Sequence, residues 1–427
     1  MSANRPVGLL EVVVNNRNFR LLWLAQLISQ LGDWFNVVAT ATLVGYLTGS
    51  AAAIGVLFAV RLAAPVFVSP LAGVCADLMN RKHILIASDI ARALTMLGFL
   101  LIRTPDDIWL VYTLTAIQLG LSGLFYPTRE AILPDLARGG ELVAANVLGM
   151  ASWSVMVSVG TAIGGVIAGV WGPAPAFMID AMTFVISALL LAQIRYAPVL
   201  RAEHARPSVR SAIAQYGHSL AYLRANPAIF IAVLHNVFIA AFAATTSDIF
   251  AAGIARDVFV YGAGGSISLG IMLACSGLAS GMAPGSFLRT FGGTFARKHH
   301  AIIAGYAIIA IGAFVVAPLA SFATALAGIA LRGTGSSLVW VFSTQLLLEQ
   351  VPEHLRGRVF ATHFAMFQLA GASAALGVGH ALDALGYSAV MDALGGVVLV
   401  PGVAFTVWYL ARGRRPVAVA VEQPADS

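Results

Sequence analysis

Six side chains that can carry charge or form strong hydrogen bonds lie deep inside long apolar runs of this sequence. They are Asp33, Arg61, Asp89, Arg92, Gln118 and Arg332. A charged group in apolar surroundings is unfavourable unless a partner neutralises it. A carboxyl group in such a place can bind and release a proton, and a guanidinium can hold either that carboxylate or an anionic ligand.

Asp33 and Arg61 are predicted to lie at similar depth on neighbouring antiparallel helices. Asp33 comes 14 residues after the start of the first apolar run at residue 19, and Arg61 comes 16 residues before Asp77. At about 1.5 Å per helical residue these spacings give about 21 Å and 24 Å from the same surface. One interpretation is a switchable proton or substrate site, and the other is a permanent structural ion pair.

The remaining embedded groups suggest different roles. Asp89 and Arg92 are spaced i, i+3 and share one helix face, which predicts a structural pair. Gln118 is a candidate for lining a cavity. Arg332 has no acid near it in sequence, so we expect it to face the cavity or to meet an acid from another helix. Three further acids are predicted to be hydrated near helix ends: Asp180, Asp248 and Asp392.

The elements that position these residues are membrane helices. The chain has 427 residues, of which 59% are hydrophobic and 10% charged, and its mean hydropathy is +0.86. A soluble domain is about 25% charged, and a β-barrel would alternate apolar and polar residues in segments of about ten. We therefore predict an all-α membrane protein with twelve transmembrane helices. The runs are 19–46, 53–76, 83–102, 109–128, 141–170, 175–194, 227–250, 265–288, 300–319, 322–347, 358–382 and 388–411.

Basic residues set the predicted orientation. With the N-terminus inside, 20 of the 25 Lys and Arg residues fall in inner segments, two in outer segments and three in apolar runs. This asymmetry follows the positive-inside rule and places both termini in the cytoplasm. Anionic lipid accounts for the net charge of +6, so no nucleic-acid partner is implied.

A long polar segment divides the twelve helices into two sets of six. The predicted units are a first bundle (1–194), a cytoplasmic linker (195–226), a second bundle (227–411) and a cytoplasmic tail (412–427). Residues 211–223 form either an amphipathic surface helix or a solvated linker. Short matches repeat in order in the two halves at offsets of 216, 218 and 212 residues: 81–83 with 297–299, 133–139 with 351–357, and 178–181 with 390–393. The bundles are therefore predicted to be pseudo-symmetric.

A charged bend between the second and third runs carries a family resemblance. The pattern Gly73-x-x-x-Asp77-x-x-x-Arg81-Lys82 resembles the signature loop of the major facilitator superfamily. Further stretches, at 16–33, 125–134 and 352–359, look like the branch that holds macrolide-efflux and enterobactin-type exporters. Gly160, Gly164 and Gly165 keep part of the helix-five motif of exporters, although Thr161 stands where proline is common.

The resemblance implies a latch between the two halves. In it Asp77 lies against the N-terminus of the helix that begins near Arg358, and Arg81 bridges to an acid. Glu130 is the first candidate for that acid and Asp135 the second. The alternative is a plain topological anchor of basic residues at an inner loop.

The predicted function is secondary transport by alternating access in the bacterial inner membrane. The favoured form is proton-coupled efflux of an amphipathic small molecule, either a drug or a siderophore-like metabolite. The alternatives are a lysophospholipid flippase, an uptake permease, or a non-transporting sensor on the same fold. No enzyme constellation, metal-ligand pattern or nucleotide loop is present, so we expect no enzyme activity and no cofactor beyond the proton gradient. The partners expected are the substrate, protons and lipid, and the protein is predicted to be monomeric.

Overall fold

The structure is a computed structural model that describes residues 8–137, 139–196, 209–291 and 295–411. Within these ranges the chain is helical and has no strand. The first six long helices are α2 (Arg17–Thr48), α3 (Ala51–Leu78), α4 (Arg81–Gly98), α5 (Ile108–Leu136), α6 (Gly140–Trp171) and α7 (Pro173–Ala192). The second six are α9 to α10 (Pro227–Asp257), α11 (Ser266–Phe291), α12 (Phe295–Val316), α13 (Phe322–Gln350), α14 (Arg356–Leu385) and α15 (Tyr387–Ala411).

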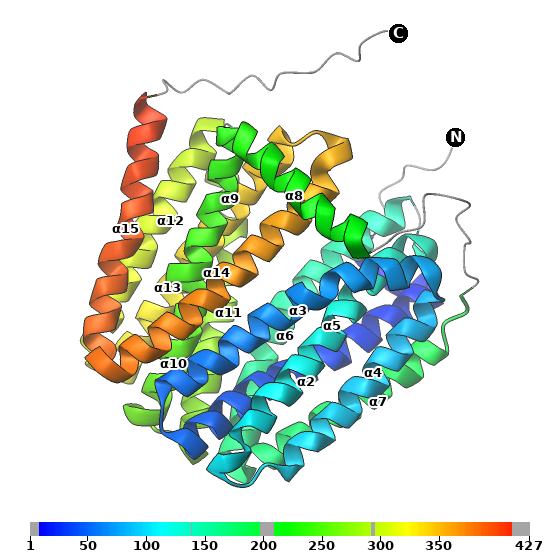
Figure 1. The fold of residues 1–427 in the computed structure, drawn as a ribbon, viewed down its shortest axis with the longest axis horizontal. Coiled ribbons are helices and arrows are strands. Elements are labelled where there is room, and N and C mark those ends of the chain that lie inside the picture. The colour runs from blue at the N-terminus through cyan, green and yellow to red at the C-terminus, as the bar shows by residue number, and fades with distance from the viewer. Residues whose placement is uncertain (1–7, 138, 197–208, 292–294, 412–427) are drawn as a thin grey trace.

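The all-α architecture predicted from the sequence is confirmed, with a long helix over each predicted run. Short helices complete it: α1 (Leu9–Asn15) precedes the first half, and α8 (Val209–Ala225) covers the predicted amphipathic segment. Figure 1 shows the first half, coloured from blue to blue-green, beside the second half, coloured from green to red. The predicted tail and residues 197–208 of the predicted linker lie outside the described residues.

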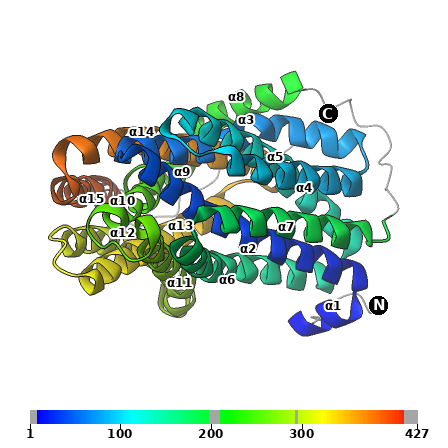
Figure 2. The same ribbon diagram turned by 90° about the horizontal axis from the view of Figure 1, so that it is seen from below.

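The ends of the helices form two faces, which we name for reference. The linker face carries α1, α8 and the connections near residues 79–80, 193–196 and 351–355. The far face carries the connections near residues 49–50, 258–265 and 386. In Figures 1 and 2, α8 lies across the linker face, and it contacts α3 of the first half as well as α9 and α14 of the second.

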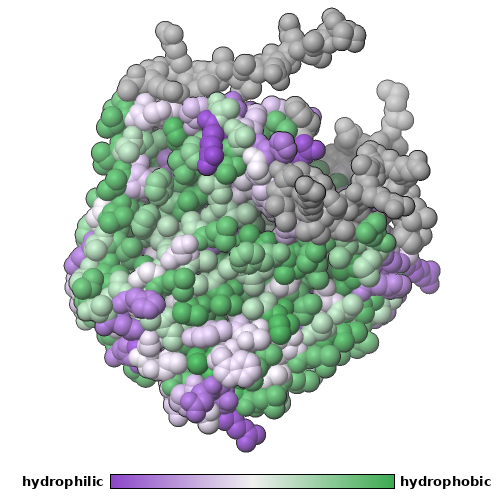
Figure 3. All heavy atoms as spheres, viewed as in Figure 1, coloured by the Kyte–Doolittle hydropathy of each residue, from purple (hydrophilic) through white to green (hydrophobic). Residues whose placement is uncertain are grey.

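Most of the long helices have the length and composition of membrane spans. Eleven helices in the described ranges meet both conditions, and α2 is the long helix that does not. Its 32 residues suffice to cross a bilayer, but polar side chains follow one of its faces and lower its hydropathy. Figure 3 shows apolar side chains over the middle of the molecule and hydrophilic ones near its ends.

Two pairs of helices join the halves, and glycines bring them close. A Cβ on Gly55 of α3 would lie 2.4 Å from the Ala375 carbonyl oxygen of α14, and a Cβ on Gly165 of α6 would lie 2.8 Å from the Cα of Gly270 in α11. Since such distances exclude any side chain, only glycine permits this packing. All four residues lie in the far-face halves of their helices, so the two bundles are tightly joined on that side.

Candidate functional site

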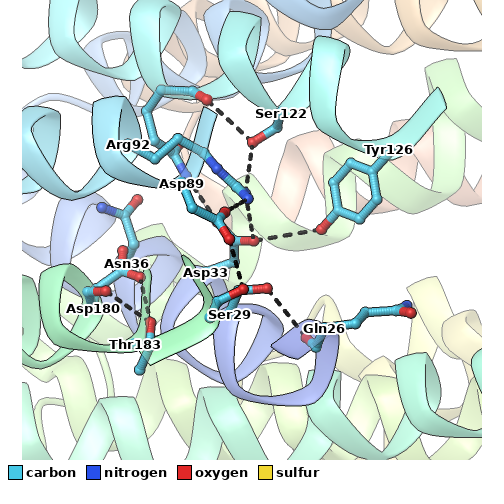
Figure 4. A network of polar contacts seen from close by, with 12 residues as sticks. Gln26, Ser29, Asp33, Asn36, Asp89, Arg92, Ser122, Tyr126, Asp180 and Thr183 are labelled. Atoms are coloured by element: carbon cyan, nitrogen blue, oxygen red, sulfur yellow. Dashed lines mark hydrogen bonds and ion pairs between the residues drawn. The ribbon is translucent and has the colours of Figure 1, made fainter. Parts of the chain in front are cut away.

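The carboxylate of Asp33 lies at the middle of α2 and receives contacts from two neighbouring helices (Figure 4). On α5, the amide nitrogen of Gln118 donates a 2.8 Å hydrogen bond to Asp33 Oδ1, and the Tyr126 hydroxyl donates a 3.4 Å bond to Oδ2. On α4, Nη1 of Arg92 lies 3.7 Å from the same Oδ2. The Asp33 side chain keeps 16% of its surface exposed, whereas that of Arg92 has none. Asp33 is therefore the exposed edge of a buried charged cluster.

Arg92 is the centre of that cluster. Its guanidinium pairs with Asp89 one turn earlier on α4, as the i, i+3 spacing predicts, and Nη1 lies 3.4 Å from the Ser122 hydroxyl. The rings of Phe125 and Phe184 lie 4.4 and 4.3 Å from its central carbon, in cation–π geometry. The fixed guanidinium thus stabilises carboxylates on two helices at once.

A stripe of polar residues on α2 brings Asp33 to this position. The members recur at helical spacing, so they share one face. They are Gln26, Ser29, Gln30, Asp33, Asn36 and Thr40, all buried except the half-buried Asp33. Because this face points into the bundle, the lipid-facing remainder of α2 stays apolar.

The predicted pairing of Asp33 with Arg61 is replaced by a pairing with Arg92. Nη1 of Arg61 donates to the Asn36 side-chain oxygen at 3.3 Å, one turn beyond Asp33 on α2. Arg61 still interacts electrostatically with Asp33 and Asp180, and with Asp248 on α10 of the other half. Arg61 lies within one helical turn of the depth of Asp33. The directions in which the side chains point, however, bring Arg92 and not Arg61 to the Asp33 carboxylate.

Asp180 departs most from its sequence-based expectation. It was predicted to be hydrated near a helix end, yet its side chain on α7 is fully buried. Asp248 is half-buried, and Asp392, at the equivalent repeat position on α15, is exposed. Asp180 is buried because α2 approaches closely at Gly32: a Cβ there would lie 2.3 Å from Asp180 Oδ1.

Arg332 of α13 meets main-chain carbonyls where an acid was expected. Its Nη2 donates to the carbonyl oxygens of Phe242 and Ala243, each at 3.2 Å, and its Nε donates to the Ser247 hydroxyl at 2.7 Å. No acid within the described ranges lies at ion-pair distance. The carbonyls are available because residues 240–244 form a π-helical turn (η3), which breaks the regular i to i−4 pattern.

The second half holds a neutral polar network that the sequence did not reveal. Asn236 of α9 contacts Nε2 of His363 at 2.9 Å and accepts a 2.9 Å bond from the Ser343 hydroxyl. The rings of Trp340 and Phe367 pack beside it, with centroids 4.9 Å apart. These side chains combine hydrogen-bonding groups with aromatic surface, which is typical of sites for amphipathic ligands.

Comparison with known proteins decides the family. A model of the Major Facilitator Superfamily matches residues 22–375, which is well over half of the chain. The chain belongs to this superfamily. Members of this superfamily are multi-pass membrane transporters, and the bacterial relatives below support a bacterial membrane as the location of this chain.

Several bacterial proteins are similar in sequence. The uncharacterized MFS-type transporter YfiS of Bacillus subtilis is 30% identical over 42% of each chain. The lysophospholipid transporter LplT of Pectobacterium carotovorum is 29% identical over 36% of each chain. The putative bacilysin exporter BacE of Bacillus amyloliquefaciens is 26% identical over 45% of this chain and 49% of that one. The matched region spans less than half of each of these relatives.

Solved transporter structures share the fold over nearly the whole chain. The nucleoside transporter NupG, as its D323A mutant, has a TM-score of 0.71 at 14% identity and covers 91% of this chain and 100% of its own. The peptide transporter PepTSo has a TM-score of 0.71 at 12% identity and covers 94% and 99%. At these identities the likeness shows the major facilitator fold alone.

The superfamily signature loop lies at the linker face, between α3 and α4. Nη1 of Arg81 pairs with Asp135 at 2.9 Å and donates to the Ala131 carbonyl oxygen at 2.8 Å. Burial and the Asp135 carboxylate raise the pKa of the Tyr196 phenol, which donates to that carboxylate at 3.1 Å. Glu130, the first candidate for the bridge, is 60% exposed and pairs with its neighbour Arg129. Asp135, the second candidate, takes the place because it lies one turn beyond Ala131, facing α4.

Two other members of the predicted latch, Lys82 and Arg358, are described by the structure. Lys82 donates to the carbonyl oxygens of Ala192 and Ile194, where its charge suits the C-terminus of α7. Arg358 is exposed in the first turn of α14. Gly73 and Asp77 belong to the last turns of α3, where side-chain placement lies outside the described residues. The latch role of Asp77 therefore stays a prediction.

A carboxylate at the far face joins the two halves. Asp383, near the C-terminus of α14, accepts hydrogen bonds from the Ser50 hydroxyl at 2.7 Å and from the main-chain nitrogens of Ala51 and Ala52 at 2.8 and 2.9 Å. It thus supplements Ser50 as a cap on the first turn of α3. Sequence reasoning missed this contact, although a Ser before an apolar run marks a helix start.

The three glycines of the helix-five motif serve two interfaces. A Cβ on Gly160 would lie 2.7 Å from the Trp34 side chain, and one on Gly164 would lie 2.7 Å from the Cα of Phe35, both on α2. Gly165 faces α11 of the other half, as described above. The motif therefore packs α6 against the helix that carries Asp33 and against the opposite bundle.

Proposed function

We propose that this transporter is a proton-coupled exporter of amphipathic small molecules that works by alternating access. The single observation that carries the proposal is the partly exposed Asp33 carboxylate at the edge of a buried cluster of acids and arginines. A carboxylate held by Arg92, Gln118 and Tyr126 can accept a proton from water and then loosen these contacts. Protonation would thereby change the attraction between α2, α4 and α5.

The orientation follows from the distribution of basic residues. We place the linker face in the cytoplasm of a bacterial inner membrane, because most Lys and Arg residues lie in the segments on that side. In this orientation the tight α3–α14 and α6–α11 contacts close the outer side. The protein acts as a monomer, with the proton gradient as its energy source.

The substrate is an amphipathic metabolite or drug, of the kind exported by the macrolide-efflux and enterobactin-type branch that the sequence resembles. The half-buried rings of Trp340 and Phe367 support this class, since they provide apolar surface beside uncharged polar side chains. The relative named as a putative bacilysin exporter supports the direction of transport.

Lysophospholipid transport is the second candidate. It is favoured by the relative named as a lysophospholipid transporter, whose match covers 36% of this chain. A lysophospholipid is itself amphipathic, so the two candidate substrates differ in whether they carry a phospholipid headgroup and in whether they enter the transporter from the lipid or from water.

The test uses the full chain in liposomes with an imposed pH gradient. The probes are ethidium, bacilysin and a fluorescent lysophosphatidylethanolamine. We expect proton-driven movement of at least one probe, and its loss with a protonophore. Asp33→Asn should abolish this movement while probe binding stays measurable, and Asp392→Asn, an exposed acid on α15, should behave like the wild type.

The outcomes separate the candidates. Movement of the lysolipid alone would favour the second candidate, and undiminished proton-driven transport by Asp33→Asn would overturn the assignment of Asp33. Transport indifferent to the protonophore would overturn proton coupling itself.

A further inference from the structure

Asp180 is a buried carboxyl group with almost no polar partner. Its side chain is fully buried, and Oδ2 has no hydrogen-bond partner among the described residues. The Thr183 hydroxyl lies 3.4 Å from Oδ1, but its nearer acceptor is the main-chain carbonyl oxygen of Asp180 at 2.7 Å. No cation in the described ranges is at ion-pair distance from it.

The contrast with Asp89 shows what an ionised acid requires in this interior. Asp89 is equally buried, yet it is paired with Arg92 and accepts a 2.6 Å bond from the Ser187 hydroxyl. An ionised carboxylate without such partners is strongly unfavourable in apolar surroundings, and the group becomes neutral instead. By this argument Asp180 carries a proton in the conformation seen here.

Asp180 also lies directly beside the residue that precedes Asp33. A Cβ atom on Gly32 would lie 2.3 Å from Asp180 Oδ1 and 2.2 Å from the Thr183 hydroxyl oxygen. Figure 4 shows Asp180 and Thr183 on one side of α2 and the Asp33 contacts on the other. Gly32 therefore leaves the space in which the Asp180 carboxyl packs against α2, one residue before Asp33.

The charges around α7 support a single shared proton. Of the elements packed against α7, α2 contributes Asp33 and α4 contributes Asp89 and Arg92, while the other charged or titratable residues near these helices' starts (Arg17, Arg20, Arg81, Lys82 and His83) lie in the first turns at the linker face. Helix α6 has one ionisable residue, Glu141, in its first turn, and the short helix η1 (Phe99–Leu101) has none. Arg61 of α3 acts at longer range.

The sum of these charges leaves one negative charge in excess. Three acids (Asp33, Asp89 and Asp180) face two guanidiniums (Arg61 and Arg92), so full ionisation would give 2 − 3 = −1. In the other half, one acid on α10 and one arginine on α13 add no net charge. One bound proton therefore neutralises this set of five residues.

We propose that Asp180 is a second proton-binding residue of this transporter and that Asp180 and Asp33 share one transferable proton. The proposal rests on the proposed proton coupling. In the transfer, the O–H bond of Asp180 breaks and an O–H bond forms on Asp33, so the proton moves and the total charge is unchanged. Exchange with water takes place at Asp33, since Asp180 has no exposed surface.

The test is infrared spectroscopy of the full-length protein in liposomes at neutral pH. A protonated carboxylic acid has a carbonyl stretch that is separate from the carboxylate bands and shifts in D2O. We expect this band in the wild type, its loss in Asp180→Asn, and its persistence in Asp392→Asn, the control at the repeat-equivalent position. Asp180→Glu should keep the band at a shifted frequency, which guards against a folding defect in the Asn variant.

Transport provides the second readout, with the probe that the wild type moves. Asp180→Asn should lose proton-driven accumulation and keep exchange of probe across the membrane, because exchange needs no net proton movement. A band that persists unchanged in Asp180→Asn, or a wild type without the band, would overturn the proposal. Loss of protonophore sensitivity in the wild type would overturn the proposed function instead.

Discussion

Replacement of Asp383 by alanine should weaken the closure of the far face. The carboxylate accepts three hydrogen bonds from the first turn of α3, at 2.7, 2.8 and 2.9 Å, and it belongs to the opposite half of the molecule. These bonds exist when the far-face ends of α3 and α14 are together, and they break when the ends separate. Their removal therefore acts on one conformation and spares the other.

The size of the effect follows from the chemistry of helix caps. A capping acceptor contributes about 0.5–2 kcal/mol, and a carboxylate at a helix N-terminus contributes about 0.3–1 kcal/mol. Because Asp383 is exposed, we take about 1 kcal/mol, near the lower end, which changes the equilibrium between conformations about fivefold. Asn is also a good cap, so Asp383→Asn should give a smaller change than Asp383→Ala.

Distances between two spin labels on the far face measure this equilibrium. Suitable sites are Arg103 in the first half and Ala320 in the second, both of which are exposed. Cys75 and Cys275, the two cysteines of the chain, are first replaced by alanine. We expect Asp383→Ala to enlarge the population with the longer distance.

The control is Asp106→Asn, which removes an exposed far-face acid that has no ion pair with the other half among the described residues. It should leave the distance distribution as in the unmodified background. The reasoning is refuted if Asp383→Ala and the control give the same distribution, or if the alanine variant shortens the mean distance.

Three further changes test other parts of the structure. Arg92→Gln leaves buried Asp89 without its counter-ion, so the protein should lose about 3–5 kcal/mol of stability against thermal unfolding in detergent, and Asp89→Asn in the same chain should restore part of it. Gly270→Val places a Cβ atom 2.5 Å from a main-chain carbonyl oxygen of α6, so it should increase the population with the longer far-face distance in the spin-label assay. Gly377→Val, at a position with open space, should leave that population unchanged. Arg332→Met leaves two carbonyls of the π-helical turn without a donor, which should lower stability by about 1–3 kcal/mol.

Each of these has an outcome that contradicts it. Unfolding of Arg92→Gln at the wild-type temperature would show that the pair adds nothing to stability. Equal distance distributions for the two valine variants would remove the glycine contact as a determinant of closure. An unchanged Arg332→Met protein would show that water satisfies the carbonyls.

The sequence was sufficient to predict the fold and the depth of Asp33 and Arg61 along their helices. Helix bounds followed from apolar runs of about 20 residues ended by Gly, Pro or charge, and the spacing of Asp89 and Arg92 predicted their shared face. The pairing of Asp33 with Arg92 was missed because the depth of a residue along its helix does not determine the direction in which its side chain points around the helix axis. Which arginine an acid meets depends on how each helix is rotated about its axis, and apolar helices give little sign of that rotation.

Asp180 shows a second limit of prediction from the sequence. Its distance from the helix end was consistent with hydration, although Asp180, Thr183 and Ser187 recur at helical spacing and could have indicated the buried face of α7. The burial depends on Gly32 of another helix, whose missing side chain leaves the room. Likewise, the carbonyl partners of Arg332 exist because α9 to α10 contains a π-helical turn, for which the sequence AAFAA gives no signal.

The cap that Asp383 places on α3 has a consequence for the resting populations of this transporter. Helix α3 carries its own acid, Asp77, at the opposite end, where the signature loop predicts the same kind of cap on α14. Two caps of one chemical type differ little in free energy, so the net bias that they give to one end state should be within about 1 kcal/mol, a ratio of about five. A transporter balanced in this way needs only one proton or one bound substrate to reverse its preferred conformation. Without either, it should sample both sides of the membrane rather than wait on one.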